Sequence, residues 1–241
     1  MLIAAAVCPH PPLLVPEVTG ASDPGVRELR RLRATCREAV AVLLGAAPDL
    51  LVVVGGAGHT AEYPPAAGGS LLDFAVPFTA GGDPGLPLSL TIGKWLLAGA
   101  APGGPPAAWW GIASDAPPAD CLALGAKLAL LAPRVALLAL GDGPARRARG
   151  VPGAADPGAD RYDEQVTAAV AAADPGALAA LDPRQDDELF VAGRAAWQVL
   201  AGAAAGTVSP AAQAGGFTAR LRYAAAPFEV SYYVATWLRA D

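Results

Sequence analysis

The sequence predicts an α/β fold with a mostly parallel or mixed central sheet, helices on both faces and a C-terminal β-hairpin. Three short segments, 2–7, 50–54 and 135–140, are continuously apolar, as strands buried on both faces are. Segments with helical periodicity separate them, and this alternation is typical of a sheet covered by helices. The chain has 241 residues and no linker long enough to divide it, so we expect one domain over 1–241.

Each element follows from a local pattern. Apolar or small residues recur every three to four positions over 26–44, with arginines on the other face, which predicts an amphipathic helix. Near the end of the chain, 220–223 alternates polar and apolar residues and 228–237 is rich in aromatic and β-branched residues, so the short connection at 226–227 predicts a hairpin. The other expected elements are strands at 73–76 and 107–112 and helices at 88–98, 121–131, 160–173, 175–181, 185–191 and 194–204.

Composition and charge narrow the class of protein. The net charge is −5, without the basic face of nucleic-acid binders, so no nucleic-acid partner is expected. No apolar run approaches the roughly 18–20 residues that span a bilayer, and the N-terminus lacks the basic start of a signal peptide. The three cysteines form no CxxC pair, which fits reduced thiols in the cytoplasm. Assembly into a homo-oligomer stays open.

The chain contains two histidines, and each follows an apolar strand at a turn rich in glycine or proline. His10 lies in residues 8–12 (CPHPP), and His59 in residues 55–60 (GGAGHT). Open α/β sheets bind ligands beyond the carboxyl ends of their strands, so two such histidines could hold one divalent metal. The alternative is that each is a half-buried turn histidine bonded to the backbone.

Three other polar residues could join that edge of the sheet. Asp142 follows the third apolar strand, between two glycines, and could orient a ligand or a histidine or cap the next turn. Arg146 belongs to a local group of arginines that could bind a carboxylate or phosphate, or could simply be solvated. Glu229, expected inside the last strand, is either on an exposed face or turned toward the site.

These segments resemble, in order, parts of the class III extradiol ring-cleavage dioxygenases (the LigB-type catalytic subunit) and their Memo-like relatives. Residues 8–12 resemble the loop that carries the first iron histidine, and residues 58–60 resemble the second. Residues 141–146 fall where the family has a strand end leading to a catalytic histidine. Residues 192–203 resemble the helix that brings the third metal ligand, which is glutamate in the dioxygenases and cysteine in the Memo-like branch.

The resemblance implies a specific chemistry. Two histidines, here His10 and His59, and a carboxylate hold Fe(II) with open positions, so that a catechol-type aromatic binds beside O2 and is cut next to its hydroxyls. The sequence departs from this pattern, since Ala145 or Arg146 replaces the catalytic histidine and the third-ligand position has no side-chain donor. Arg146 could bind a substrate anion beside Asp142. The substitutes for the third ligand are Glu229, Glu62, Asp142, Cys8 or water.

Three functions are therefore open. The first is an Fe(II)-dependent dioxygenase with an altered site, acting on an aromatic and anionic small molecule. The second is a non-catalytic or Memo-like descendant that binds a small molecule or a protein in the same crevice and needs no metal. The third is a hydrolase in which His10, His59 and a carboxylate hold Zn(II) to activate water.

Overall fold

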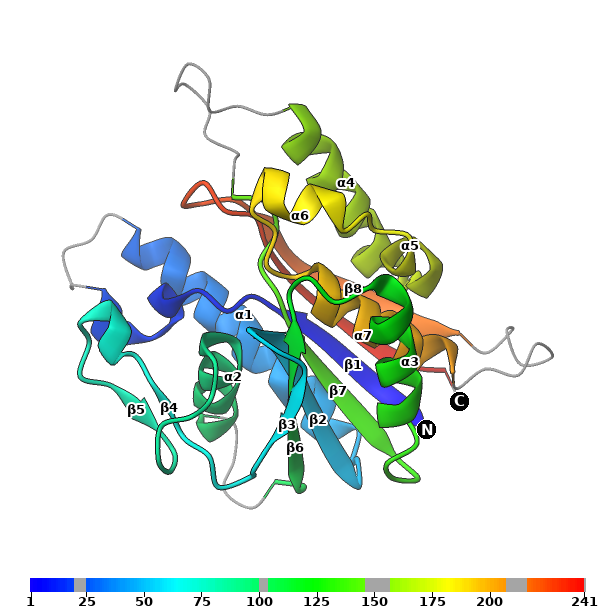
Figure 1. The fold of residues 1–241 in the computed structure, drawn as a ribbon, viewed down its shortest axis with the longest axis horizontal. Coiled ribbons are helices and arrows are strands. Elements are labelled where there is room, and N and C mark those ends of the chain that lie inside the picture. Colours follow the sequence, from blue (N-terminus) through cyan, green and yellow to red (C-terminus); the bar gives the residue numbers. More distant parts are fainter. Residues whose placement is uncertain (20–24, 100–103, 146–156, 207–215, 241) are drawn as a thin grey trace.

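A seven-stranded mixed sheet runs through the molecule (Figure 1). The computed structural model describes residues 1–19, 25–99, 104–145, 157–206 and 216–240. The strand order is β3 (Ala61–Tyr63), β6 (Ala107–Ala113), β2 (Leu50–Ala57), β7 (Val135–Leu140), β1 (Leu2–Cys8), β9 (Tyr232–Arg239) and β8 (Phe217–Ala225). The four central strands β6, β2, β7 and β1 are parallel, and β3, β9 and β8 pair antiparallel at the two sides. The predicted fold class and the C-terminal hairpin are confirmed.

The strand β7 shows why a strand at the centre of the sheet has a continuously apolar sequence. All six of its residues are buried, because β2 and β1 flank it and helices cover both of its faces. Leu140 at its end is in register with Cys8 of β1 and with Gly55 of β2. The carboxyl ends of the parallel strands therefore meet at one edge of the sheet, which places the segments that follow them side by side.

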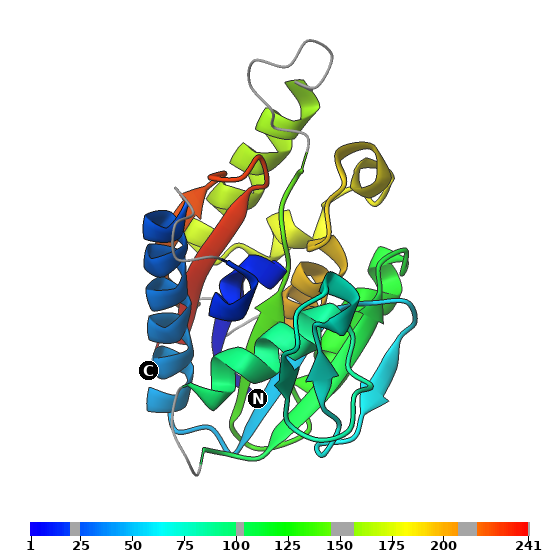
Figure 2. The same ribbon diagram turned by 90° about the vertical axis from the view of Figure 1, so that its left-hand side faces the viewer.

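Helices cover both faces of the sheet (Figure 2). One face carries α1 (Val26–Gly45) and α2 (Leu88–Ala98), and α1 buries the apolar stripe that its periodicity predicted, from Leu29 to Leu43. The other face carries four helices: α3 (Pro118–Leu128), α4 (Pro157–Ala172), α5 (Pro175–Ala179) and α7 (Arg194–Ala205). The short helix α6 (Arg184–Leu189) precedes α7. None of the described helices is both long and apolar enough to cross a bilayer.

The helices α3 and α7 cross with their backbones in close contact. A Cβ atom on Gly125 of α3 would lie 1.9 Å from the carbonyl oxygen of Val199, and one on Gly202 of α7 would lie 2.1 Å from that of Leu122. Both are far below any van der Waals distance, so each position requires the absence of a side chain. Two glycines therefore fix how close these helices come.

One predicted strand is absent from the structure, and some short strands were not predicted. Residues 73–76 do not form a strand, because η3 (Leu72–Phe74) is a 3-10 turn and Ala75 adopts a left-handed conformation with φ 57° that ends it. The strand β3 and the two-stranded sheet of β4 (Gly69–Ser70) and β5 (Thr79–Ala80) were not predicted, because these strands are too short to show a periodicity. The turns η1 (Pro12–Leu14) and η2 (Pro16–Val18) follow β1.

The connection between β8 and β9 is longer than predicted. The strand β9 begins at Tyr232, so residues 226–231 form the turn, and Glu229 adopts a left-handed conformation with φ 60°. Glu229 therefore lies in the hairpin turn and not inside the last strand. The three cysteines are buried and unbridged, as expected for small core residues.

Candidate functional site

Two adjacent parallel strands bring His10 and Asp142 together. His10 lies two residues beyond β1, and Asp142 two residues beyond β7. The backbone N–H of His10 donates to Asp142 Oδ1 at 2.8 Å, and the Nδ1 atom of the His10 ring lies 3.7 Å from the same oxygen. The backbone N–H of Gly141 donates to the carbonyl of Cys8 at 3.0 Å, which extends the sheet pairing up to this point. Of the readings open for Asp142, orienting a histidine is the one that this geometry supports.

The His10–Asp142 pair is shielded from solvent. His10 is only 7 % exposed, and its Nδ1 atom is buried with no hydrogen-bond partner among the described residues. Burial raises the pKa of Asp142, while the charge and the backbone hydrogen bond of His10 act in the opposite direction. Burial, and then the charge of Asp142, also raises the pKa of Tyr232, which keeps that phenol neutral. The site thus combines a carboxyl that is easier to protonate with an imidazole nitrogen that still lacks a partner.

The positions on either side of Asp142 have no room for a side chain, so glycine is needed at both. A Cβ atom on Gly141 would lie 2.5 Å from the Cα atom of Gly193, and one on Gly143 would lie 2.6 Å from the hydroxyl oxygen of Tyr233. The chain therefore passes closely between α7 and β9 before and after Asp142. This close passage fixes the backbone that positions the carboxylate.

The other candidate ligands lie elsewhere. His59 is exposed in the bend between β2 and β3, and its ring centroid is 6.4 Å from that of Tyr63. Glu229 is exposed and lines a hollow of about 620 Å³ beside α4, together with Asp163 and Glu164. Arg146 lies outside the described residues. The set of His10, His59 and Glu229 is therefore not assembled into one group.

A three-ligand metal centre does not fit the donors that the structure presents. Within the described ranges, no group of three or more His, Cys, Asp or Glu side chains is placed to hold a metal ion. At the position that resembles the third ligand, a Cβ atom on Gly193 would lie 2.2 Å from the ring of Trp197. The indole of Trp197 therefore occupies the space into which a ligand side chain at position 193 would extend.

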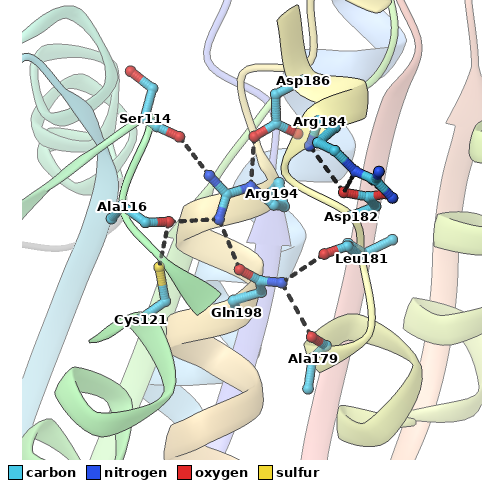
Figure 3. A network of polar contacts seen from close by, with 10 residues as sticks. All are labelled: Ser114, Ala116, Cys121, Ala179, Leu181, Asp182, Arg184, Asp186, Arg194 and Gln198. Atoms are coloured by element: carbon cyan, nitrogen blue, oxygen red, sulfur yellow. Dashed lines mark hydrogen bonds and ion pairs between the residues drawn. The ribbon is translucent and has the colours of Figure 1, made fainter. Parts of the chain in front are cut away.

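A second polar cluster, which was not predicted from the sequence, lies beyond the end of β6 (Figure 3). Arg194 is buried, and its guanidinium donates to the carbonyls of Ser114 and Ala116 at 2.6 and 2.8 Å and to Gln198 at 2.8 Å. Its Nε atom donates to Asp186. The only signal in the sequence was an arginine and a glutamine four residues apart on an otherwise apolar helix.

The Asp186 carboxyl is unusual within this cluster. One of its oxygens, Oδ1, is buried without a hydrogen-bond partner among the described residues. Burial raises the pKa of Asp186 to about 6, although the Arg194 guanidinium acts against this shift. Asp186 also lines a hollow of about 380 Å³ with Ser114, Arg184 and neighbouring residues. The carboxyl is thus held in a place that disfavours its charge.

This burial predicts that Asp186 lowers the stability of the fold as the pH rises. Its folded pKa of about 6 exceeds the ordinary value of 3.8, so the folded state binds this proton more tightly than the unfolded state does. The stabilisation is fully present below the ordinary pKa and is lost as the pH rises through the folded pKa. In urea unfolding between pH 3.5 and 7.5, the wild type should lose up to roughly 3 kcal/mol relative to Asp186→Asn. A difference between the two proteins that stays constant over this range would contradict the prediction.

Comparison with known proteins adds little to this geometry. No protein-family model matches the chain, and no curated protein matches it. Among solved structures, the chain is similar to an uncharacterized protein, JW3007, from Escherichia coli K12, with a TM-score of 0.49 and 17% sequence identity over 97% of this chain and 99% of that one. Function must therefore be argued from the site itself.

Proposed function

We propose that this protein binds a small hydroxylated aromatic molecule at the carboxyl edge of its sheet, where His10 and Asp142 form an acid–base pair that moves a proton on the ligand. The observation that carries this proposal is the His10–Asp142 contact, in which a buried imidazole nitrogen, without a hydrogen-bond partner among the described residues, lies 3.7 Å from a partly buried carboxylate. The resemblance to class III dioxygenases supports an aromatic ligand with ionisable hydroxyls. The proposed function extends the second of the three functions considered above, the binding of a small molecule without a metal, by a proton-transfer step.

The pair can act as follows. A movement of about 0.5–1 Å would bring Nδ1 of His10 within hydrogen-bond distance of Asp142 Oδ1. An Nδ1–H bonded to the carboxylate leaves Nε2 as the atom that accepts a proton, and the carboxylate stabilises the imidazolium that forms. The backbone hydrogen bond from His10 to Asp142 keeps the two groups in this arrangement throughout. The ligand would lose a hydroxyl proton to Nε2, and it could receive that proton back.

Imidazole NMR tests the proposal directly, because the chain has two histidines and therefore two sets of ring signals. Protein treated with EDTA is titrated with catechol under nitrogen, and His59→Gln assigns the signals. We expect the His10 signals to shift saturably while those of His59 stay in place. His10→Gln should weaken catechol binding at least about tenfold, because a charge-assisted hydrogen bond is lost.

His59→Gln is the matched control, since it removes the exposed histidine. Its affinity for catechol should equal that of the wild type. Asp142→Asn should also weaken binding while leaving the far-ultraviolet circular dichroism unchanged. Binding that requires added Fe(II), or that both histidine variants lose equally, would contradict the proposal and favour the iron-dependent dioxygenase. An absence of any shift at His10 would also contradict it.

A further inference from the structure

A third hollow lies between α1 and the loop that follows β1, and arginines line it. Its volume is about 560 Å³, and Arg30, Arg33 and Arg37 line it together with Pro16 and Thr19 of the loop that follows β1. The spacing of three and then four residues places the three guanidiniums on one side of the helix. Neither the sequence motifs nor the proposed function uses this hollow.

Arg33 is fixed at the base of this arginine hollow. The side chain is buried, and its Nε atom donates to the carbonyl of Leu14 at 2.7 Å. Its Nη2 atom donates to the carbonyl of Leu13 at 2.8 Å and to Thr19 Oγ1 at 3.1 Å. These bonds leave Nη1 without a hydrogen-bond partner in the described part of the chain. The guanidinium is thus held in place before any ligand arrives, which lowers the entropic cost of binding.

The positive charge of the hollow is only partly offset by nearby carboxylates, of which Glu17 in the lining loop acts on Arg33. The two carboxylates next to it on α1 lie against other arginines, since Glu28 is 3.7 Å from Arg31 and Glu38 is 3.6 Å from Arg222. Among the described residues, no ion pair joins Arg30, Arg33 or Arg37 to a carboxylate. Burial, and then the charges of Arg37 and Arg30, lower the pKa of Arg33, and the charge of Glu17 opposes this shift only in part. The three like charges of the hollow therefore act on one another.

Arg37 adds a further constraint. Its guanidinium lies 5.4 Å from the centroid of the Trp95 ring of α2, so it rests on an aromatic face instead of moving freely in solvent. Arg30 and Arg37 are both exposed, whereas Arg33 is buried. One buried and two exposed arginines therefore line a single space, in a chain whose net charge is −5.

We infer that the arginine hollow is a binding site for a phosphate-type oxyanion, either inorganic phosphate or the phosphate group of a small ester. Three guanidiniums around one hollow suit a tetrahedral dianion, whose several oxygens can accept from each of them, better than a planar carboxylate with two oxygens. The inference does not depend on the function of the His10–Asp142 pair. It assigns this face of α1 a ligand of its own.

Calorimetry at constant ionic strength tests the assignment, with phosphate, glycerol 3-phosphate, sulfate and acetate as probes. We expect saturable binding of phosphate with one site per chain and much weaker binding of acetate. Tighter binding of the ester than of phosphate would identify an organic ligand, and the reverse would identify the free ion. Arg30→Ala combined with Arg37→Ala should weaken phosphate binding at least about tenfold.

Arg27→Ala is the matched control, because Arg27 is exposed on the same helix and does not line the hollow. It should bind phosphate within about twofold of the wild type. Arg33 is left unchanged in these variants, since it also holds the loop after β1. Equal losses in Arg27→Ala and in the double variant, or no saturable binding to the wild type, would overturn the inference. The double variant should still bind catechol, so the two proposals fail independently.

Discussion

Replacing Arg194 with alanine should lower the free energy of unfolding by about 3–5 kcal/mol, the loss expected when one partner of a buried ion pair is removed. The side chain is fully buried, and the variant would leave the Asp186 carboxylate without its partner. The carbonyls of Ser114 and Ala116 and the amide oxygen of Gln198 would also lose their donor. Buried polar groups left without partners add to the cost.

Urea unfolding followed by circular dichroism measures this loss. Arg184→Ala is the matched control, because Arg184 also pairs with an aspartate, Asp182, but its side chain is 87 % exposed. Solvent screens such a pair, so the control should unfold at the same urea concentration as the wild type. Arg194→Met separates packing from charge, since it refills the volume but leaves Asp186 unpaired. If Arg194→Met were as stable as the wild type, the network would not contribute to stability in the way described.

Replacing Gly125 with alanine should also destabilise the fold strongly, by about 1–3 kcal/mol or more. The added Cβ atom would meet the backbone of Val199 and Ala203, and a backbone cannot rotate away as a flexible side chain can. The helices α3 and α7 would have to move apart, which would open their contact with the sheet. Gly202→Ala should act in the same way from the opposite helix, through Leu122.

Gly45→Ala is the control for this pair of variants. Gly45 is the last residue of α1, and a Cβ atom there would meet nothing within 4 Å. Alanine has the higher helix propensity, so this variant should be as stable as the wild type or more stable by up to about 1 kcal/mol. Thermal unfolding of the three variants would measure the contrast. An equal change at Gly45 and Gly125 would show that propensity, and not the close crossing of α3 and α7, sets the effect.

The sequence was sufficient for the central strands of the sheet but not for its short edge strand β3 or for all of the site. Periodicity is a local property, so the three apolar strands and the long helix α1 could be located without knowledge of their partners. The sequence predicted that His10 and Asp142 both follow strands that end at the same edge of the sheet, but it did not show that the two are in contact. His59 differs because β2 continues to Ala57, so the chain leaves the sheet just before that histidine and carries it to the surface.

The remaining features depend on contacts between distant segments. Nothing near Asp186 in the sequence indicates that a buried arginine will approach it, and the glycines of α3 and α7 look unfavourable for a helix until the two are seen to cross. Glu229 was misplaced because a β-rich composition does not show where a hairpin turns. Periodicity predicted only that the arginines of α1 lie on the face opposite the apolar stripe, and it cannot tell an open surface from a hollow closed by the preceding loop.

The position of β9 has a consequence for how the chain is made. This strand lies between β1 and β8, and it pairs Leu238 with Ala4. Until β9 has left the ribosome, β1 has an open edge with unpaired backbone groups, and such an edge invites pairing with other chains. Contacts between residues so far apart in sequence also slow folding. Nascent chains that stop before Tyr232 should therefore be held by chaperones or aggregate, and the sheet should close only after β9 has emerged.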